Sequence, residues 1–246
     1  MKLICANWKM NKTTKDTREY INKFLPLVEG VKDREIVLFP PFTSLCVAKE
    51  LLENTNVKLG AQNCHYEDKG AFTGEVSLDM LVDLDVSYVI VGHSERRWIF
   101  GESDELINRK VVACLKKGVR PILCVGERLE EREANLTFKV VETQIRLALS
   151  GVEEYVDQID IAYEPVWAIG SGNPATPEDA QVVHRFIKDL IHSIAPKSEG
   201  KFRVLYGGSV NPENASEFMK MPDIDGLLVG TASLNPDSFA KIVKSF

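Results

Sequence analysis

Short apolar runs, rich in β-branched residues, recur along the chain at a spacing of roughly 25 to 40 residues. The eight runs are Leu3–Ala6, Ile36–Phe39, Val57–Ala61, Tyr88–Val91, Pro121–Val125, Ile159–Tyr163, Arg203–Tyr206 and Gly226–Val229. Runs of this kind, bounded by polar residues and turn signals, are typical of strands that are buried in a sheet. The pattern therefore predicts eight short strands.

The segments between these runs carry helix signals. Thr176-Pro177-Glu178-Asp179 supplies an N-cap residue, a first-turn proline and two acidic residues, all of which favour the start of a helix. Ser103-Asp104-Glu105 predicts a second helix that ends near Gly118, and Asn211-Pro212-Glu213 predicts a third. The first of these helices has one apolar stripe, made of Ala180, Val183, Phe186, Ile187, Leu190 and Ile191.

Strands that alternate with helices indicate parallel βαβ units. Eight such units follow one another in 246 residues with no hydrophilic linker between them. Because a closed (β/α)8 barrel needs roughly 250 residues, we expect one barrel domain of eight parallel strands over residues 1–246. An open doubly wound sheet is the alternative, and the lack of a G-x-G-x-x-G motif after the first strand disfavours it.

Charge and cysteine usage limit the partners and the compartment. The net charge is −6, which disfavours nucleic acid or an anionic membrane as the main partner. The five cysteines are scattered without a C-x-x-C pair, so we expect a reducing, cytoplasmic setting with no disulfide framework and no zinc site. Neither a signal-peptide pattern nor a membrane-length apolar run is found in the sequence.

Glu164 is the strongest single candidate for chemistry. It follows the predicted strand Ile159–Tyr163 and precedes the apolar, glycine-containing segment Pro165–Gly172. Active sites of such barrels lie at the carboxyl ends of the strands. An apolar loop beside a carboxylate favours a lid that keeps water away from a general base, and the alternative is a strand end capped by a hydrophobic turn.

Two further polar residues follow predicted strands. His93 precedes Ser94-Glu95-Arg96-Arg97, which looks like a helix start. A helix N-terminus disfavours positive charge, so we expect a neutral imidazole that donates to a developing oxyanion. Lys9 stands beside Asn7 after the first strand, where it suits either anion binding or Schiff-base chemistry. The other three histidines, His65, His184 and His192, are interpreted as structural.

Glycine turns follow the last two predicted strands, at Gly207-Gly208-Ser209 and at Gly230-Thr231. Backbone N–H groups in such turns bind phosphate, and the loops after strands seven and eight are the usual phosphate site of a barrel. A base, a neutral histidine, a cation and a phosphate site suit proton abstraction next to a carbonyl on a small phosphorylated substrate.

These residues lie in segments that resemble the triosephosphate isomerase family, in order and over the whole chain. The matching segments are Asn7–Asn11, Gly60–Asn63, Gly70–Glu75, Val91–Arg97, Ala162–Gly170 and Leu205–Val210. The resemblance implies a closed (β/α)8 TIM barrel that needs no cofactor. It also implies interconversion of dihydroxyacetone phosphate and D-glyceraldehyde 3-phosphate through an enediol, in glycolysis and gluconeogenesis.

The resemblance further implies roles for individual residues. Glu164 would be the base, and His93 would polarise the carbonyl. Lys9 and Asn7 would bind substrate and stabilise charge, with Glu95 as a supporting acid. The phosphate would be held by the N–H groups of Gly170, Ser209, Gly230 and Thr231. The Gly70–Glu75 loop would dock into a second copy in a homodimer, with Thr73 reaching the other active site.

The chain departs from the family pattern at two places. Thr231 replaces a glycine, so a phosphate contact there needs a negative φ, and the alternative is that Thr231 is the N-cap of a short helix. Pro174 lies at the far end of the expected lid and restricts Asn173, so we expect an altered rate of lid closure. Two other functions stay open: a sugar-phosphate aldolase that uses Lys9 as a Schiff base, and an inactive phosphate-binding or assembly protein.

Overall fold

The eight predicted runs form the strands of one closed, all-parallel barrel. The computed structural model describes residues 1–169 and 175–246. Each strand pairs with the next along the chain, and the first pairs with the last, which confirms the closed barrel and excludes the open sheet. The strands are β1 Lys2–Asn7, β2 Arg34–Phe39, β3 Val57–Ala61, β4 Tyr88–Val91, β5 Arg120–Val125, β6 Asp160–Tyr163, β7 Val204–Tyr206 and β8 Gly226–Val229.

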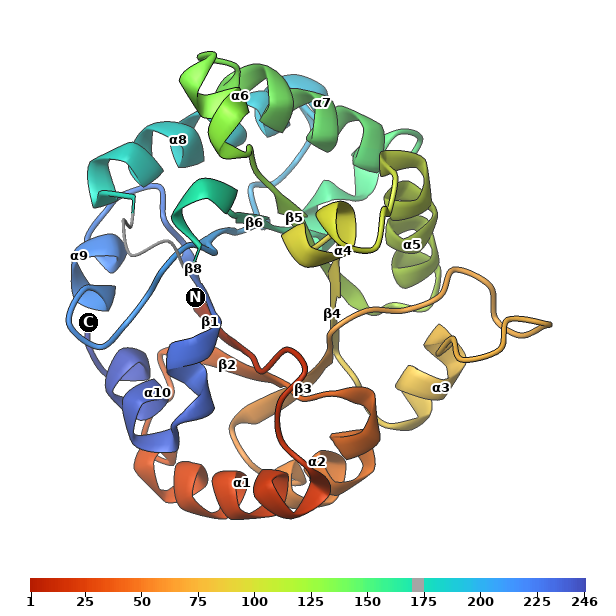
Figure 1. Cartoon of the computed structure of the whole chain (residues 1–246), viewed down its shortest axis with the longest axis vertical. Coiled ribbons are helices and arrows are strands. Elements are labelled where there is room, and N and C mark those ends of the chain that lie inside the picture. Colours follow the sequence, from red (N-terminus) through yellow and green to blue (C-terminus); the bar gives the residue numbers. More distant parts are fainter. Residues whose placement is uncertain (170–174) are drawn as a thin grey trace.

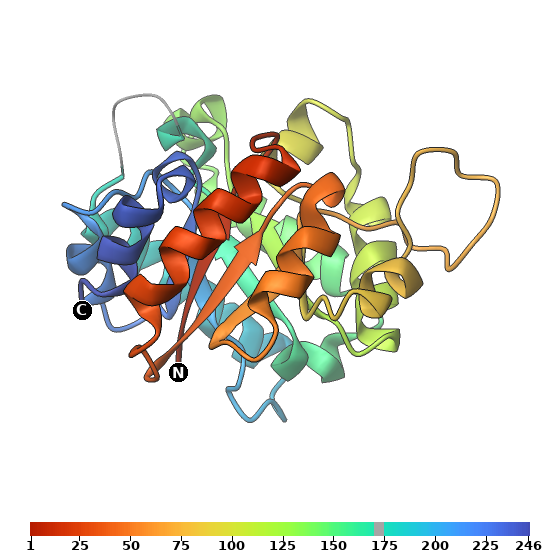
Figure 2. The ribbon, with the colours of Figure 1, turned by 90° about the horizontal axis from the view of Figure 1, so that it is seen from below.

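Helices surround the barrel (Figure 1). The α-helices are α1 Thr14–Val28, α2 Leu45–Leu52, α3 Leu78–Asp83, α4 Ser94–Trp98, α5 Asp104–Lys116, α6 Leu129–Glu133, α7 Thr137–Leu149, α8 Pro177–Ile194, α9 Ala215–Met219 and α10 Pro236–Val243. Short 3₁₀ helices occur at η1 Phe42–Ser44, η2 Glu153–Gln158, η3 Val166–Ala168 and η4 Thr231–Leu234. Between β3 and α3 the chain extends away from the barrel as a long loop (Figure 2).

The predicted helix starts are correct in two cases and early in the third. The side chains of Ser103 and Thr176 cap α5 and α8, as expected. By contrast, α9 begins at Ala215 rather than at Asn211. The Asn211 side chain accepts hydrogen bonds from the N–H groups of Glu213 and Asn214, so it closes a polar turn before the helix instead of opening the helix itself.

Alternating positions of each strand divide the apolar residues between two layers. In β1, Leu3 and Cys5 belong to the cluster that fills the barrel, whereas Ile4 and Ala6 pack against the surrounding helices. This division is what a parallel sheet buried on both faces requires. The barrel is therefore solid, and only its two ends are free to bind polar groups.

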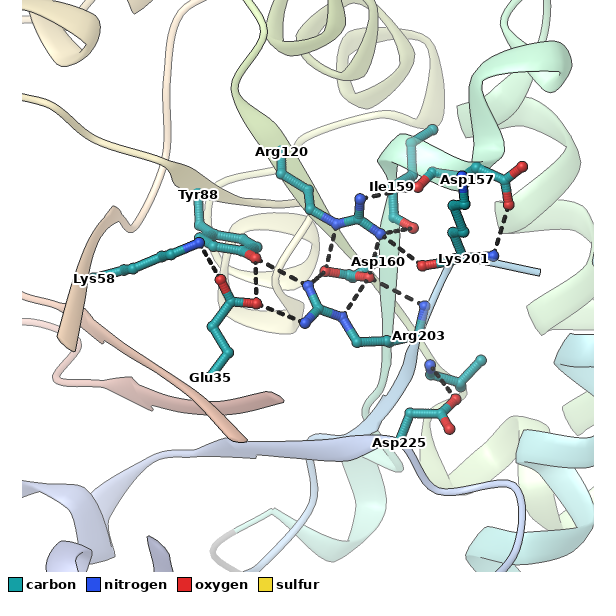
Figure 3. Close-up of polar contacts among 11 residues, drawn as sticks. Glu35, Lys58, Tyr88, Arg120, Asp157, Ile159, Asp160, Lys201, Arg203 and Asp225 are labelled. Atoms are coloured by element: carbon teal, nitrogen blue, oxygen red, sulfur yellow. Dashed lines mark hydrogen bonds and ion pairs between the residues drawn. The ribbon is translucent and has the colours of Figure 1, made fainter. Parts of the chain in front are cut away.

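The amino-terminal end of the barrel is closed by a network of charged side chains (Figure 3). Asp160 is fully buried and accepts paired hydrogen bonds from the guanidinium groups of Arg120 and Arg203. Arg203 also donates to Glu35 at 2.7 Å. Burial would raise the pKa of Glu35, but its bonds to Arg203, Lys58 and Tyr88 outweigh burial and lower it to about 2. These carboxylates and cations pair with one another and leave little charge free to bind a ligand. A binding site is therefore expected at the opposite end of the barrel.

Candidate active site

A pocket at the carboxyl ends of the strands gathers most of the predicted site residues. Its lining includes Asn7, Lys9, His93, Glu164, Ser209, Gly230 and Thr231, which come from β1, β4, β6, β7 and β8 or the loops that follow them. Glu95 lies next to the pocket and is joined to it through Lys9. Gly170 and Pro174 lie outside the described residues. Side chains far apart in sequence thus meet because parallel strands end together.

The Glu164 carboxylate is buried and held by two donors. Its Oε1 lies 2.9 Å from Nε2 of His93, and its Oε2 accepts a 2.9 Å hydrogen bond from the N–H of Ser94. Burial would raise the pKa of Glu164, but His93, the Ser94 N–H and Lys9 together lower it. The group is therefore a carboxylate at neutral pH, and both of its oxygens are engaged by the protein in this state.

The backbone around Glu164 leaves no spare room. Its N–H donates to the carbonyl of Val125 at 2.8 Å, which continues the pairing of β5 and β6. A Cβ at Gly126 would lie 1.7 Å from the carbonyl oxygen of Glu164, and a Cβ at Gly207 would lie 2.9 Å from its Cγ. Only glycine fits at Gly126, because real Cβ atoms do not approach backbone this closely. The base is thus fixed by two glycines as well as by its polar partners.

His93 is the N-cap residue of α4, and its ring bridges the helix and the base. Nδ1 accepts a 3.2 Å hydrogen bond from the N–H of Glu95, so the proton of this tautomer is on Nε2, which faces Glu164. Burial disfavours the charged ring, but the Glu164 carboxylate outweighs burial and raises the pKa of His93. The helix start and the carboxylate therefore act in opposite directions on this ring.

Lys9 adopts an uncommon backbone conformation that its neighbours hold in place. Its φ of 54° lies in the left-handed region, which costs roughly 1–3 kcal/mol for a residue with a side chain. The Asn7 side chain accepts from the Lys9 N–H at 3.1 Å, and the Gln62 amide donates to the Lys9 carbonyl at 2.8 Å. The ammonium group then lies 2.7 Å from Glu95 and close to Gly230.

The two glycine turns line the same pocket as His93. A side chain at Gly208 would displace Tyr206, because a Cβ there would lie 2.2 Å from the Tyr206 hydroxyl oxygen. Gly230 is the N-cap residue of η4. Thr231 is the first residue of η4, and its φ is negative. The expected sign of φ is therefore confirmed. The alternative that Thr231 is the N-cap is wrong, because η4 begins at Thr231 and the Ser233 N–H and hydroxyl both donate to the Gly230 carbonyl.

The sequence interpretation missed Glu127 and assigned no role to Gln62, although Gln62 lies in the matching segment Gly60–Asn63. Glu127 is fully buried and accepts hydrogen bonds from Thr137, from Tyr163 and from the Trp167 indole at 2.9 Å. It thereby fixes η3, the part of the expected lid that the structure describes. The available signal was a polar residue separated from the fifth apolar run by Gly126 alone, which resembles the signal that identified Glu164.

Comparisons with known proteins agree with this geometry. The profile of the family described as Triosephosphate isomerase matches residues 2–246. Triosephosphate isomerase of Aquifex aeolicus is 70% identical over 245 residues, which cover 100% of this chain and 99% of the relative. The protein of the same name from Dictyoglomus thermophilum is 52% identical, with 99% of both chains covered. This chain therefore belongs to the triosephosphate isomerase family.

Proposed function

We propose that the pocket interconverts dihydroxyacetone phosphate and D-glyceraldehyde 3-phosphate through an enediol, as a step of glycolysis and gluconeogenesis. The observation that carries this proposal is the pair formed by Glu164 and His93. A carboxylate base and an Nε2–H donor lie 2.9 Å apart beside two glycine turns suited to phosphate. We assign the whole of residues 1–246 to this one domain.

Glu164 removes a proton from the carbon next to the carbonyl and returns it to the neighbouring carbon. To do so, its carboxylate must break its hydrogen bonds to His93 and to the Ser94 N–H and move into contact with the substrate. That exchange also frees the His93 Nε2–H, which then donates to the carbonyl oxygen. Because the carboxylate is what raises the pKa of His93, its departure favours the neutral ring that this step needs.

The remaining residues either bind the phosphorylated substrate or position the groups that bind it. Lys9 offers an ammonium group to the negative charge on the substrate, and Asn7 holds the Lys9 backbone. Glu95 orients Lys9 through their 2.7 Å ion pair. The phosphate is held by the N–H groups of Ser209, Gly230 and Thr231, together with that of Gly170.

An assay with D-glyceraldehyde 3-phosphate as the only substrate, coupled to the oxidation of NADH by a dihydroxyacetone phosphate reductase, tests the reaction directly. The aldolase alternative is separated by borohydride. Reduction in the presence of a ketose phosphate would add substrate mass at Lys9 in an aldolase and leave an isomerase unmodified. Failure of turnover, with phosphate compounds still bound, would instead support the inactive binding protein.

We also propose that the chain works as a homodimer through the Gly70–Glu75 loop. This loop extends away from the barrel (Figure 2) and carries Phe72, whose surface is 40% exposed. Its base is fixed by a bridge between His65 and Ser77. Apolar side chains are exposed on the loops after β1 and α4 as well, at Met10, Ile99 and Phe100. A second copy would cover surfaces that have no reason to face water.

Substitution of an exposed phenylalanine tests the dimer. We expect Phe72→Asp to give a monomer of much lower activity in sedimentation and kinetic assays, because Lys9 and His93 lose the support of the partner. Phe138→Asp is the matched control, since Phe138 is 44% exposed on α7 and also packs on a single aromatic neighbour. A fully active Phe72→Asp monomer would contradict the proposal.

No α-helix within residues 1–169 and 175–246 has the length and hydropathy needed to cross a bilayer. A cytoplasmic location is part of the proposal, and it rests on the cysteine pattern and on the triose phosphate substrate.

A further inference from the structure

Two buried cysteines from separate elements touch one another outside the active site. Cys64 follows the end of β3, and Cys114 lies on the inner face of α5, 50 positions further along the chain. Their sulfur atoms are 3.8 Å apart, and both side chains are almost completely buried. Neither residue lines the active-site pocket, so the proposed reaction has no use for this pair.

The contact lies at the base of the long loop. Asn63, which precedes Cys64, accepts a 2.8 Å hydrogen bond from Lys110 on α5. His65, which follows it, donates from its N–H to the carbonyl of Val76 at 2.8 Å. Both neighbours of Cys64 are thus fixed, and the helix that carries Cys114 is fixed against the same segment. The two sulfur atoms are held together by the fold and do not have to find each other.

We propose that Cys64 and Cys114 are a modification site, where a hydroperoxide converts the two thiols into an intramolecular disulfide. One thiolate attacks the hydroperoxide and becomes a sulfenic acid, and an alcohol or water leaves. The second thiol then attacks the sulfenic sulfur, the S–S bond forms, and water is released. The thiols lose two electrons in total, and the hydroperoxide gains them. A disulfide has a sulfur–sulfur distance of about 2.05 Å, so the two sulfur atoms, which are now 3.8 Å apart, must move closer for the bond to form.

The environment of Cys114 sets the speed of this reaction. Its contact with Cys64 and its burial raise the pKa of the Cys114 thiol, so the thiolate is scarce at neutral pH. Because the thiolate is the reactive form, we expect slow oxidation that accelerates as the pH rises. The exposed cysteine, Cys46, should react first, and its oxidation therefore serves as an internal control for exposure to the oxidant.

The disulfide would fasten the base of the long loop to α5. It would close a chain segment of about 50 residues, which restricts the unfolded state strongly, and an increase in Tm of roughly 5–15 °C is expected. Glu164, His93 and Lys9 make no contact with either sulfur atom, so activity should persist in the oxidised protein. The inference is independent of the proposed reaction.

Peptide mapping after controlled oxidation tests the proposal. The reduced full-length protein is treated with hydrogen peroxide, or with diamide to spare the methionines, and then unfolded in iodoacetamide. When Cys46 is replaced by serine, four of the five cysteines remain, and we expect only two of these, Cys5 and Cys124, to be alkylated. We also expect a linked peptide pair containing Cys64 and Cys114 that is about 2 Da lighter than its parts. Cys46→Ser should keep the link, whereas Cys64→Ala and Cys114→Ala should each lose both the link and the increase in Tm.

Two outcomes would overturn the inference. One is that Cys64 and Cys114 stay open to alkylation after Cys46 is fully oxidised and the pH has been raised. The other is that one of them gains oxygen as a sulfinic acid without forming the link, since that would show that the partner thiol cannot reach it. Because both readouts use the unsubstituted pair, they do not depend on whether the alanine variants fold.

Discussion

Shortening the proposed base by one methylene tests how much its position matters while its charge stays the same. Glu164→Asp keeps the carboxylate but withdraws it by roughly 1 Å. In the native protein the two oxygens are each 2.9 Å from a donor, one on His93 and one on Ser94. After the withdrawal these distances approach about 4 Å, which is too long for a hydrogen bond. The aspartate can therefore neither keep its resting bonds nor reach the substrate carbon.

The expected cost follows from the misplacement. A shift of about 1 Å at a reacting group can slow a reaction about 10²-fold, which is about 2.7 kcal/mol at roughly 1.36 kcal/mol for each factor of ten. The protein cannot move the backbone inward to compensate, because Gly126 already touches the Glu164 carbonyl. The glycine turns are untouched, so KM should change little.

Steady-state kinetics in both directions measure this effect, with Glu164→Gln as the control. The amide keeps the length of the side chain but cannot take a proton, so we expect a larger loss of kcat, about 10²- to 10⁴-fold. It also removes the carboxylate that raises the pKa of His93. Burial then dominates, and the pKa of His93 should fall below its usual 6.5. A steady kcat with an increased KM in Glu164→Asp would show that Glu164 binds substrate without acting as the base.

Three further outcomes are expected. His184 is fully buried, and burial lowers its pKa to about 3. In the unfolded chain this side chain binds a proton below pH 6.5 whereas the native ring does not, so the free energy of unfolding should fall by up to about 1.4 kcal/mol per pH unit as the pH is lowered from 6.5 to 3. His184→Phe should flatten that slope in guanidinium unfolding. Asp160→Asn should cost about 3–5 kcal/mol of unfolding free energy with kcat unchanged, because it removes the buried carboxylate that neutralises the partly buried Arg120 and Arg203. By contrast, Glu199→Gln at the exposed ion pair with Lys201 should change nothing measurable. Nitrogen NMR of the His93 ring with a bound substrate analogue should show a proton on Nε2 alone at pH 7, and a doubly protonated ring would refute the neutral acid.

The barrel was predictable because its signal is local. Each strand is buried on both faces, so each one is an apolar run, and the count and order of the runs define the topology. Helix starts were readable where a side chain caps the helix, as at Ser103 and Thr176. Asn211 was misread because the same side chain can cap a helix or close a turn, and only the later course of the chain decides between them.

The candidate residues were also readable, since polar residues directly after buried strands are few. What the sequence could not supply was the partner of each residue. Glu127 and Gln62 act through groups far along the chain, on Trp167 and on the Lys9 carbonyl. Such contacts leave no periodic trace, because they depend on which loops the closed barrel brings side by side.

The sequence by itself determined the eight-unit barrel, the end of the barrel where the candidate site residues gather, and the family. The tertiary structure decided the electrostatics. The helix start at Ser94 favours a neutral His93, but the fold places the Glu164 carboxylate 2.9 Å from its ring and reverses the direction of its pKa. The same is true of Cys64 and Cys114, which are 50 positions apart and 3.8 Å from sulfur to sulfur. Charge and reactivity depend on distance through space, and only the closed barrel sets that distance.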